Sequence, residues 1–384
     1  MDHEFITPAP KLSELLHALV NLGGSDLHLS PLNKPIVRID GDLAPLTDYD
    51  PLKTEDTNEY ATSILTDAKQ QLLESEKQVD ASISVKGLSR FRINVCDGRS
   101  GLQISLRVIP YEPPALETLG IPQNMISLAS RPHGLILVTG PTGSGKSTTL
   151  AAFIDKINRE RAKKIITIED PIEFLHTSKR CLVQQRELDT NTRSFASATK
   201  NAVREDPDIV LIGELRDLAT IEEALRVAEM GHLTFATLHS NTAASTITRI
   251  IDVFPALQQA QIRTQLAEVL IGVMSQQLLP RKEGKGRVMA LETMIPTTPI
   301  QNLIRENKIS QINSFMATGQ DTHQMITMNH SLGRLVGNGI VTRETAEYYS
   351  PNLDDFRTTV GIYQQTQRTK IPAPTQARHQ HVRA

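Results

Sequence analysis

The sequence is poor in the residues that stabilise small secreted folds or hold structural metals. It contains two cysteines in 384 residues, Cys96 and Cys181, and neither belongs to a C-x-x-C pair. This spacing excludes a zinc ribbon and a disulfide framework. Tryptophan is absent and aromatic residues make up 4% of the chain. A nucleic-acid surface built from stacked aromatic side chains is therefore not indicated.

Long apolar runs and an excess of positive charge are missing as well. No run approaches the roughly 18 apolar residues that span a bilayer, and the first ten residues lack the apolar core of a signal peptide. The formal net charge is −2, so no overall positive field attracts nucleic acid. We expect a cytoplasmic protein with enough chain for two or three domains.

Residues 1–110 are predicted to form a small α+β domain. The segment 11–30 has the pattern of an amphipathic helix, a Gly-Gly stop and a short strand. Asp40-Gly41 predicts a hairpin turn, and 55–75 is a helical stretch. The alternation over 89–110 predicts two strands around a glycine turn. The proline-rich segment that follows indicates a linker over 111–130.

Residues 131–254 carry the pattern of a parallel sheet covered on both faces by helices. The apolar runs GLILVTG, KKIITIED, DIVLIGEL and HLTFATLH alternate with helical segments, as in α/β folds. Residues 255–350 are predicted to be mainly helical. Residues 351–384 are predicted to be a disordered tail, because the segment after Tyr363 is basic, polar and interrupted by prolines.

The segment VTGPTGSGKSTTL contains a glycine-rich phosphate loop. Its pattern, G-x-x-x-x-G-K-S, follows an apolar strand and precedes a helical run, which is the context that this loop requires. Glycines let backbone N–H groups converge on phosphate oxygens, the lysine bridges the terminal phosphates, and the serine hydroxyl binds Mg²⁺. We therefore expect ATP and Mg²⁺ as ligands. The predicted nucleotide-binding residues are Gly140, Pro141, Thr142, Gly143, Ser144, Gly145, Lys146, Ser147 and Thr148.

Acidic residues follow two of the other predicted strands. In DIVLIGELRD, Gly213 occupies the position where a metal-holding aspartate is expected, and Glu214 follows as the candidate general base. In ITIEDPIEF, Glu169 and Asp170 end another strand. Asp170 is the candidate metal ligand besides Ser147, and Glu169 is a candidate catalytic carboxylate. An ordinary acidic turn between a strand and a helix remains the alternative for this pair.

Two histidines, His232 and His239, bracket the strand HLTFATLH. Either could contact the terminal phosphate, and either could be a structural residue at a strand end. Residue pattern alone leaves the two possibilities open.

Four segments resemble the sequence boxes of one protein family, in the family's order. They are GPTGSGKST, TIEDPIE, LIGELRD and GHLTFATLHSNTA. SDLHL and RFRIN nearer the start are similar to its amino-terminal domain. Over residues 11–349 the chain thus resembles the GspE/PilT family of secretion ATPases. The resemblance implies a homohexamer, with a PAS-like amino-terminal domain and a RecA-like P-loop ATPase core in each subunit.

The resemblance also assigns roles to several side chains. It implies that His239, and to a lesser degree His232, belong to the active site. It implies further that arginines of the amino-terminal domain reach the γ-phosphate. Of Arg90, Arg92, Arg99 and Arg107, we favour Arg92 and Arg107, because Arg99 is one residue out of step with the family pattern.

Within the family, the resemblance is greatest to the branch that retracts type IV pili. QREL, REDPDIVLIGELRD and IDVFP are similar to that branch, and so is PIQNLIREN, although Pro299 and Gln301 depart from its pattern. Two cysteines cannot build the tetracysteine zinc site of the assembly and export branches. The resemblance implies a cytoplasmic motor for twitching motility at the inner face of the inner membrane. Its partners would be an inner-membrane pilus platform protein and a paralogous retraction ATPase, with peripheral membrane association only and no nucleic acid.

Other functions remain open at this point. Inside the family the alternatives are a PilU-like accessory motor and a DotB-type secretion or conjugation ATPase. Outside it they are a RecA-like nucleic-acid translocase and a nucleotide-binding scaffold with little turnover. Near-neutral charge argues against the translocase, and Glu214 argues against the scaffold.

Overall fold

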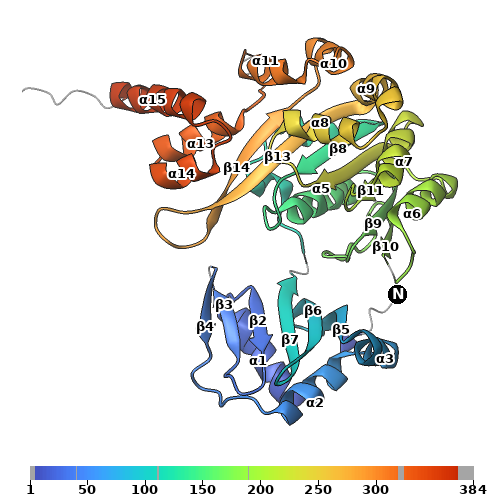
Figure 1. Cartoon of the computed structure of the whole chain (residues 1–384), viewed down its shortest axis with the longest axis vertical. Coiled ribbons are helices and arrows are strands. Elements are labelled where there is room, and N and C mark those ends of the chain that lie inside the picture. Colours follow the sequence, from blue (N-terminus) through green and yellow to red (C-terminus); the bar gives the residue numbers. More distant parts are fainter. Residues whose placement is uncertain (1–4, 40, 110–111, 189, 319–323, 371–384) are drawn as a thin grey trace, which may run out of the picture. The chain divides into compact units, whose positions relative to one another are not determined.

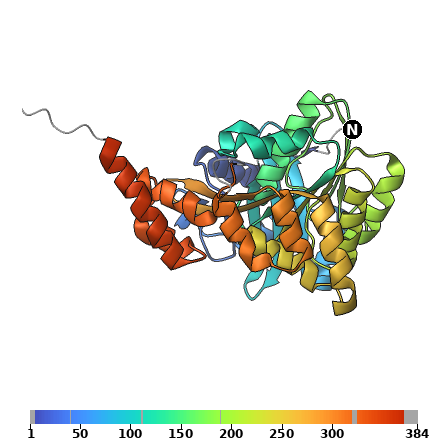
Figure 2. The ribbon, with the colours of Figure 1, turned by 90° about the horizontal axis from the view of Figure 1, so that it is seen from above.

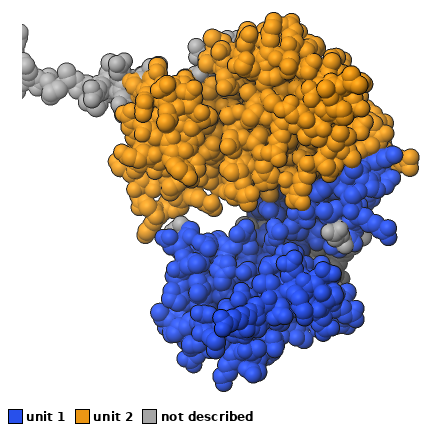
Figure 3. All heavy atoms as spheres, in the orientation of Figure 1, with its two compact units in different colours: residues 1–115, 151–202 blue, residues 116–150, 203–384 orange. Residues whose placement is uncertain are grey.

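The computed structural model describes residues 5–39, 41–109, 112–188, 190–318 and 324–370 (Figure 1). The chain forms two compact units (Figure 3). The first unit contains residues 1–115 and 151–202, and the second contains 116–150 and 203–384. No helix within the described ranges combines the length and the apolar character needed to cross a membrane.

The amino-terminal sheet of the first unit has the strand order β1-β5-β6-β7-β2-β3-β4. It contains β1 (Phe5–Ile6), β2 (Asp26–Leu29), β3 (Ile36–Ile39), β4 (Asp42–Pro45), β5 (Gln78–Val85), β6 (Ser89–Gly98) and β7 (Gly101–Ile109). Three helices accompany it, α1 (Pro10–Asn21), α2 (Thr54–Ile64) and α3 (Asp67–Glu76). Strand β6 pairs antiparallel with β7, and the pair nearest the turn is Gly98 and Gly101. Strand β3 pairs antiparallel with β4, and the pair nearest that turn is Ile39 and Asp42. Both predicted hairpins are therefore present, whereas β1 and β5 were not predicted.

The amino-terminal sheet is apolar on one face only. Along β6 the side chains of Phe91, Ile93 and Val95 are fully buried, and the residues between them are half-buried polar ones. This period of two is the signature of a sheet with one packed face. The helices supply the other half of that core, for example through Leu12 and Leu16 on one side of α1.

The rest of the first unit contains the body of α5 (Lys146–Glu160), β9 (Lys164–Glu169), β10 (Leu182–Glu187) and α6 (Phe195–Ala202). Strands β9 and β10 are parallel and in register from Lys164 and Leu182 to Glu169 and Glu187. Strand β9 confirms the predicted strand KKIITIED. Strand β10 was not predicted, because its sequence, LVQQRE, is largely polar.

The strands of the second unit follow the order β11-β12-β8-β13-β14. They are β8 (Gly134–Thr139), β11 (Ile209–Ile212), β12 (Leu233–Leu238), β13 (Leu270–Pro280) and β14 (Arg287–Met294). All but β14 are parallel. Every residue of β8, β11 and β12 is buried, as expected for strands covered on both faces. The predicted α/β fold class is confirmed.

Helices surround this sheet and continue beyond it (Figure 1). They are α4 (Gln123–Ile126), α7 (Leu218–Glu229), α8 (Ala243–Asp252), α9 (Ala256–Val269), α10 (Thr298–Arg305), α11 (Ile312–Thr318), α13 (Met328–Gly337), α14 (Arg343–Tyr349) and α15 (Leu353–Lys370). Short 3₁₀ turns lie at Leu116–Leu119, Ser127–Ser130, Val203–Glu205 and Ile309–Gln311.

Strands β13 and β14 correct the expectation that residues 255–350 are mainly helical. Strand β13 follows α9 directly, and no glycine or proline marks the change at Leu270, where the backbone becomes extended. A short apolar run cannot be distinguished from a buried helical segment by its periodicity. The pairing of β13 with β8 therefore decides its conformation.

Helix α15 corrects the expectation of a disordered tail from residue 351. Its side chains Phe356 and Val360 are buried in a cluster with residues of α13. The two helices lie side by side (Figures 1 and 2). Gly333 on α13 permits close packing, since a Cβ there would lie 3.0 Å from Tyr363 Cδ2. Residues 371–384 of the predicted tail lie outside the described residues.

Candidate functional site

The phosphate loop joins the buried strand β8 to the first turn of α5. Gly140, Gly143 and Gly145 have φ values of 145°, 78° and 89°, which favour glycine. A Cβ on Gly140 would overlap the backbone oxygen of Gln276 on β13. At these positions the loop thus requires glycine for backbone conformation and for close approach to the neighbouring strand.

Lys146 begins α5 and bends back over the loop. Its Nζ donates to the backbone oxygens of Gly140 at 2.8 Å and of Pro141 at 3.0 Å. Ser147 and Thr148 lie half-buried in the first helical turn, Pro141 and Thr142 are exposed, and Ser144 is buried. A helix N-terminus, a positive-φ loop and a lysine are the groups that bind phosphate in proteins. The predicted residues therefore lie together and fit a nucleotide's phosphates.

Glu214 and His239 meet beside this loop. Strands β11, β12 and β8 are parallel neighbours, so their carboxyl ends share one edge of the sheet. Glu214 follows β11, and its Oε1 lies 3.2 Å from Nε2 of His239, which follows β12. The other oxygen of Glu214 accepts from Arg216 Nε at 2.8 Å. The backbone around Glu214 is bound to Thr237, which donates to the oxygen of Gly213 and accepts from the nitrogen of Leu215.

The charge of His239 depends on its surroundings. Burial lowers its pKa, and the positive charge of Lys146 lowers it further, while Glu214 acts in the opposite direction. These surroundings therefore favour the neutral form of the imidazole. A histidine that favours its neutral form and a glutamate at the phosphate loop suit contact with a phosphate and with an attacking water.

His232 lies at the other edge of the sheet. It precedes β12, and its backbone oxygen accepts from Gly134 at the start of β8. Six residues of strand separate it from the phosphate loop, or ~20 Å at ~3.3 Å per residue. Within one chain the structure does not bring His232 to the loop. Its Nε2 is buried and has no hydrogen-bond partner among the described residues, and burial lowers its pKa.

Glu169 ends β9 in the first unit, beside Glu187 of β10. Its Oε1 accepts from Thr167 at 2.6 Å and from Gln185 at 3.1 Å. Burial raises the pKa of Glu169 to about 7, against these hydrogen bonds, and the carboxylates of Glu173 and Glu187 add to the rise. Asp170 is exposed. A carboxylate that titrates near pH 7 is suited to binding a cation or a proton.

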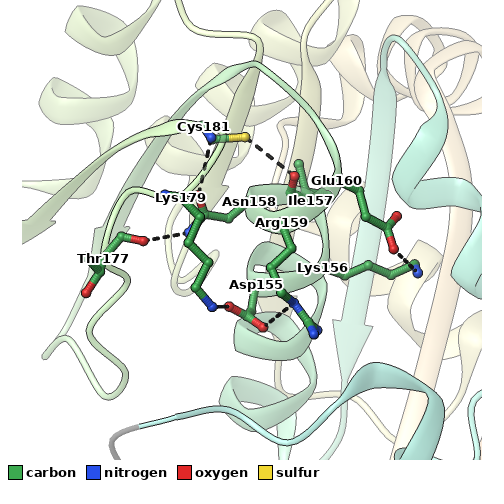
Figure 4. Close-up of polar contacts among 9 residues, drawn as sticks. All are labelled: Asp155, Lys156, Ile157, Asn158, Arg159, Glu160, Thr177, Lys179 and Cys181. Carbon is green, nitrogen blue, oxygen red and sulfur yellow. Dashed lines mark hydrogen bonds and ion pairs between the residues drawn. The ribbon is translucent and has the colours of Figure 1, made fainter.

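The segment after Asp170 is anchored to the second half of α5 (Figure 4). Asn158 donates to the backbone oxygen of Thr177 at 2.8 Å and accepts from the nitrogen of Lys179 at 3.0 Å. Lys179 also pairs with Asp155 at 2.7 Å. These contacts hold the segment that follows Asp170 against the second half of α5. No cluster of three or more metal-binding side chains occurs in the described part of the chain.

The candidate arginines lie on the polar face of the amino-terminal sheet. Arg92 on β6 pairs directly with Arg107 on β7, so the two side chains are neighbours. Arg107 Nε bonds to Asp26 Oδ1 at 2.7 Å, and Arg90 Nη2 donates to Ser82 at 2.6 Å. Arg99 is exposed in the turn that connects β6 to β7. The sequence did not show that Arg107 is already engaged by a carboxylate.

Several polar side chains beneath the phosphate loop were not recognised from the sequence. They are Thr139, Ser240, Thr246, Ser275 and Gln276, and all are buried. The polar triplet Ser-Gln-Gln inside the apolar run VMSQQLL was the available signal, but β13 itself had not been recognised.

A glycine-rich loop between a buried parallel strand and a helix, faced by a glutamate and a histidine from neighbouring strand ends, defines a P-loop nucleotide-binding protein. A family model described as "Type II/IV secretion system protein" matches residues 2–370. The chain belongs to this family, which confirms the membership predicted from the four boxes.

Individual relatives agree with this membership. The chain is 45% identical over 335 residues to the "Type IV pilus retractation ATPase PilT" of Pseudomonas aeruginosa, covering 87% of this chain and 96% of the relative. It is 45% identical over 322 residues to the "Twitching motility protein" of Neisseria gonorrhoeae, covering 84% and 86%. A crystal structure of the pilus retraction motor PilT with bound ADP superposes with a TM-score of 0.83 at 48% identity, covering 90% of this chain and 98% of that one.

Proposed function

We propose that the chain is an ATP-driven motor that retracts type IV pili and so powers twitching motility. The ATPase activity is that of its family. The direction of work is taken from the relatives that are named for retraction and twitching. The observation that carries the proposal is the position of Glu214 and His239 beside the phosphate loop.

The chain's own residues account for the steps of hydrolysis. The loop N–H groups and Lys146 bind the phosphates, for which Lys146 leaves the carbonyls that it contacts here. Glu214 orients water and accepts its proton. Neutral His239 donates to the terminal phosphate or to the water without adding charge. Mg²⁺, when bound, would neutralise charge on the phosphate oxygens.

Further residues complete the proposed site. Ser147 and Asp170 would bind the metal ion. Glu169 would act beside them as a catalytic carboxylate. Arg92 and Arg107 of the amino-terminal domain would approach the γ-phosphate, where a guanidinium offsets developing charge. Arg107 would exchange its bond to Asp26 for the phosphate. His232 is proposed only as a structural residue of its own chain.

The motor would act as a homohexamer at the cytoplasmic face of the inner membrane. Its partner would be the pilus platform protein, and a paralogous retraction ATPase would assist it. Arginines in a domain separate from the phosphate loop support the oligomer, because one subunit's domain can complete a neighbour's site. Light scattering with MgATP tests this proposal, and a fully active monomer would contradict it.

The function is tested in a deletion strain of the source bacterium. Wild-type protein should restore twitching, and Glu214→Gln should leave the cells hyperpiliated and non-motile. The matched control is Glu222→Gln, the same change on the exposed side of α7, which should restore twitching fully. Normal pili and loss of secretion or conjugation would instead indicate a DotB-type ATPase. ATPase activity that depends on added DNA would indicate a translocase.

A further inference from the structure

Strand β13 contacts the phosphate loop with two adjacent residues, Ser275 and Gln276. Successive side chains of a strand point to opposite faces of its sheet. Ser275 lies level with Thr139, the last residue of β8, and Gln276 extends one residue further, beneath the loop itself. Both are essentially inaccessible to solvent. The strand thus touches the loop and its base from both faces.

Gln276 binds the loop directly. Its Nε2 donates to the backbone oxygen of Ser144 at 2.9 Å. The same nitrogen would lie 3.3 Å from a Cβ at Gly145, and the Gln276 backbone oxygen occupies the space that a Cβ on Gly140 would need. One residue therefore limits the loop's position at Gly140, Ser144 and Gly145.

Two buried atoms in this contact have no hydrogen-bond partner among the described residues. They are Oε1 of Gln276 and Oγ of Ser144. An unsatisfied buried polar atom costs about 1–3 kcal/mol, so such atoms are uncommon in a settled core.

Ser275 connects the base of the loop to the segment that carries His239. Its Oγ lies 2.8 Å from Thr139 Oγ1. Thr246 Oγ1 on α8 lies 3.5 Å from Thr139 Oγ1 and donates to the backbone oxygen of Thr242 at 2.7 Å. Thr246 lies 2.7 Å from the hydroxyl of Ser240, the residue after His239. A buried chain of hydroxyls therefore runs from β13 through the end of β8 to the histidine segment.

We propose that Gln276 is a positioning residue for ATP hydrolysis, which holds the phosphate loop through the Ser144 carbonyl while Ser275 sets the loop's base relative to His239. The inference rests on the proposed ATPase function. Gln276 does not touch the reacting atoms in this arrangement. It acts by fixing the loop N–H groups at the spacing that the phosphates require.

Three substitutions test the proposal. Gln276→Met preserves length and removes the hydrogen-bond donor. Gln276→Glu also removes the donor when ionised, but its protonated form can donate to Ser144 again. Gln277→Met is the control, because the neighbouring glutamine is also buried in β13 and has no side-chain hydrogen bond to the described part of the loop.

The primary measurement is the affinity for a fluorescent ADP analogue, with kcat and KM for ATP beside it. Gln276→Met should weaken ADP binding by about five- to tenfold, the usual value of one hydrogen bond, and should raise KM by a similar factor. Gln276→Glu should bind more weakly still at pH 8 and recover toward wild type as the pH falls to 6. Gln277→Met should bind and hydrolyse as wild type does.

The comparison of the two methionine variants separates positioning from packing, since a loss of packing in this buried strand would weaken ADP binding in Gln277→Met as well. Wild-type affinity and KM in Gln276→Met would overturn the inference, and so would an equal loss in Gln277→Met. If the wild-type protein binds ADP but does not hydrolyse ATP, the proposed function fails while the binding measurements still decide the role of Gln276.

Discussion

The amino-terminal sheet and the sheet of the second unit differ in where their polar side chains lie. In the amino-terminal sheet one face is open, and charged residues such as Arg92 and Arg107 stand side by side across its strands. In the sheet of the second unit β8, β11 and β12 are buried on both faces. Its candidate reactive residues therefore lie where strands end, and some polar groups inside it, such as the hydroxyls of Thr139 and Ser275, bind one another. In a sheet covered on both faces, reactive side chains can reach a ligand only at the ends of the strands. On an open face, charged side chains are accessible along the strands.

The largest effect is expected at the edge of the doubly covered sheet. Glu214→Gln should retain nucleotide binding and lower kcat by about 10²–10⁴-fold, because an amide keeps the shape and cannot accept a proton. Single-turnover hydrolysis and ADP affinity measure the two quantities. A kcat above about a tenth of wild type would show that Glu214 is not the base.

A second prediction concerns a glutamate buried inside that sheet. Glu292 on β14 accepts from the nitrogen of Ala243 at 2.6 Å and from that of Met328 at 3.0 Å, so it binds the N-termini of α8 and α13. Burial raises its pKa, and both hydrogen bonds act against the rise. Glu292→Gln should lower the free energy of unfolding by about 1–3 kcal/mol, since an amide presents one acceptor oxygen to two donors.

Urea unfolding measures this change. Glu283→Gln, an exposed glutamate in the turn between β13 and β14, is the control and should change stability by less than about 0.5 kcal/mol. Equal stability of the two variants would contradict the role given to Glu292.

A third prediction uses pH at Glu169. Its pKa rises from 4.5 to about 7 on folding, so the folded state holds this proton more tightly than the unfolded state. The resulting stabilisation is complete below about pH 4.5 and is lost as the pH rises through about 7. The melting temperature of Glu169→Gln minus that of wild type should therefore increase as the pH rises from 5 to 8. If the melting temperatures of the two proteins changed with pH in the same way, the shifted pKa would be contradicted.

A smaller effect is expected on the open sheet. Arg107 is mostly exposed and pairs with the largely buried Asp26, so Arg107→Ala should cost at most about 1 kcal/mol of stability. Arg92→Ala should be neutral or slightly stabilising, because it removes a like charge opposite Arg107. If both arginines reach the γ-phosphate, each variant should nevertheless lower kcat of the assembled enzyme by tenfold or more. Unchanged kcat in both variants would leave the arginines a structural role only.

The smallest effect on stability is expected at α10. Ile300, Leu303 and Ile304 are buried, while Arg305 and Glu306 are exposed. Changing both charged residues to alanine should alter the free energy of unfolding by less than about 0.5 kcal/mol. If this surface transmits force to the pilus platform, the variant should hydrolyse ATP normally and fail to restore twitching. Normal twitching would show that α10 contributes packing alone.

Local patterns predicted the parts of the fold that depend on neighbours in sequence. Gly140 to Ser147 followed a strand and preceded a helix, as the motif requires, and the hairpins at 39–42 and 98–101 were recognisable from their turns. The periodicity did not reveal β13, because an apolar run after a helix satisfies either conformation. Helix α15 was missed because the stabilising contacts of Phe356 lie on another helix.

Sequence alone determined which chemistry this chain carries, because a glycine loop, a lysine and a strand-end glutamate are readable within a few residues. Only the tertiary structure decided which of the candidates meet. The parallel register of β8 and β12 places His239 at the loop and His232 at the far edge. Pairing of β13 with β8 brings Gln276 beneath a loop more than a hundred residues earlier in the chain. Such contacts depend on strand pairing across the sheet, and no local pattern encodes the partner of a strand.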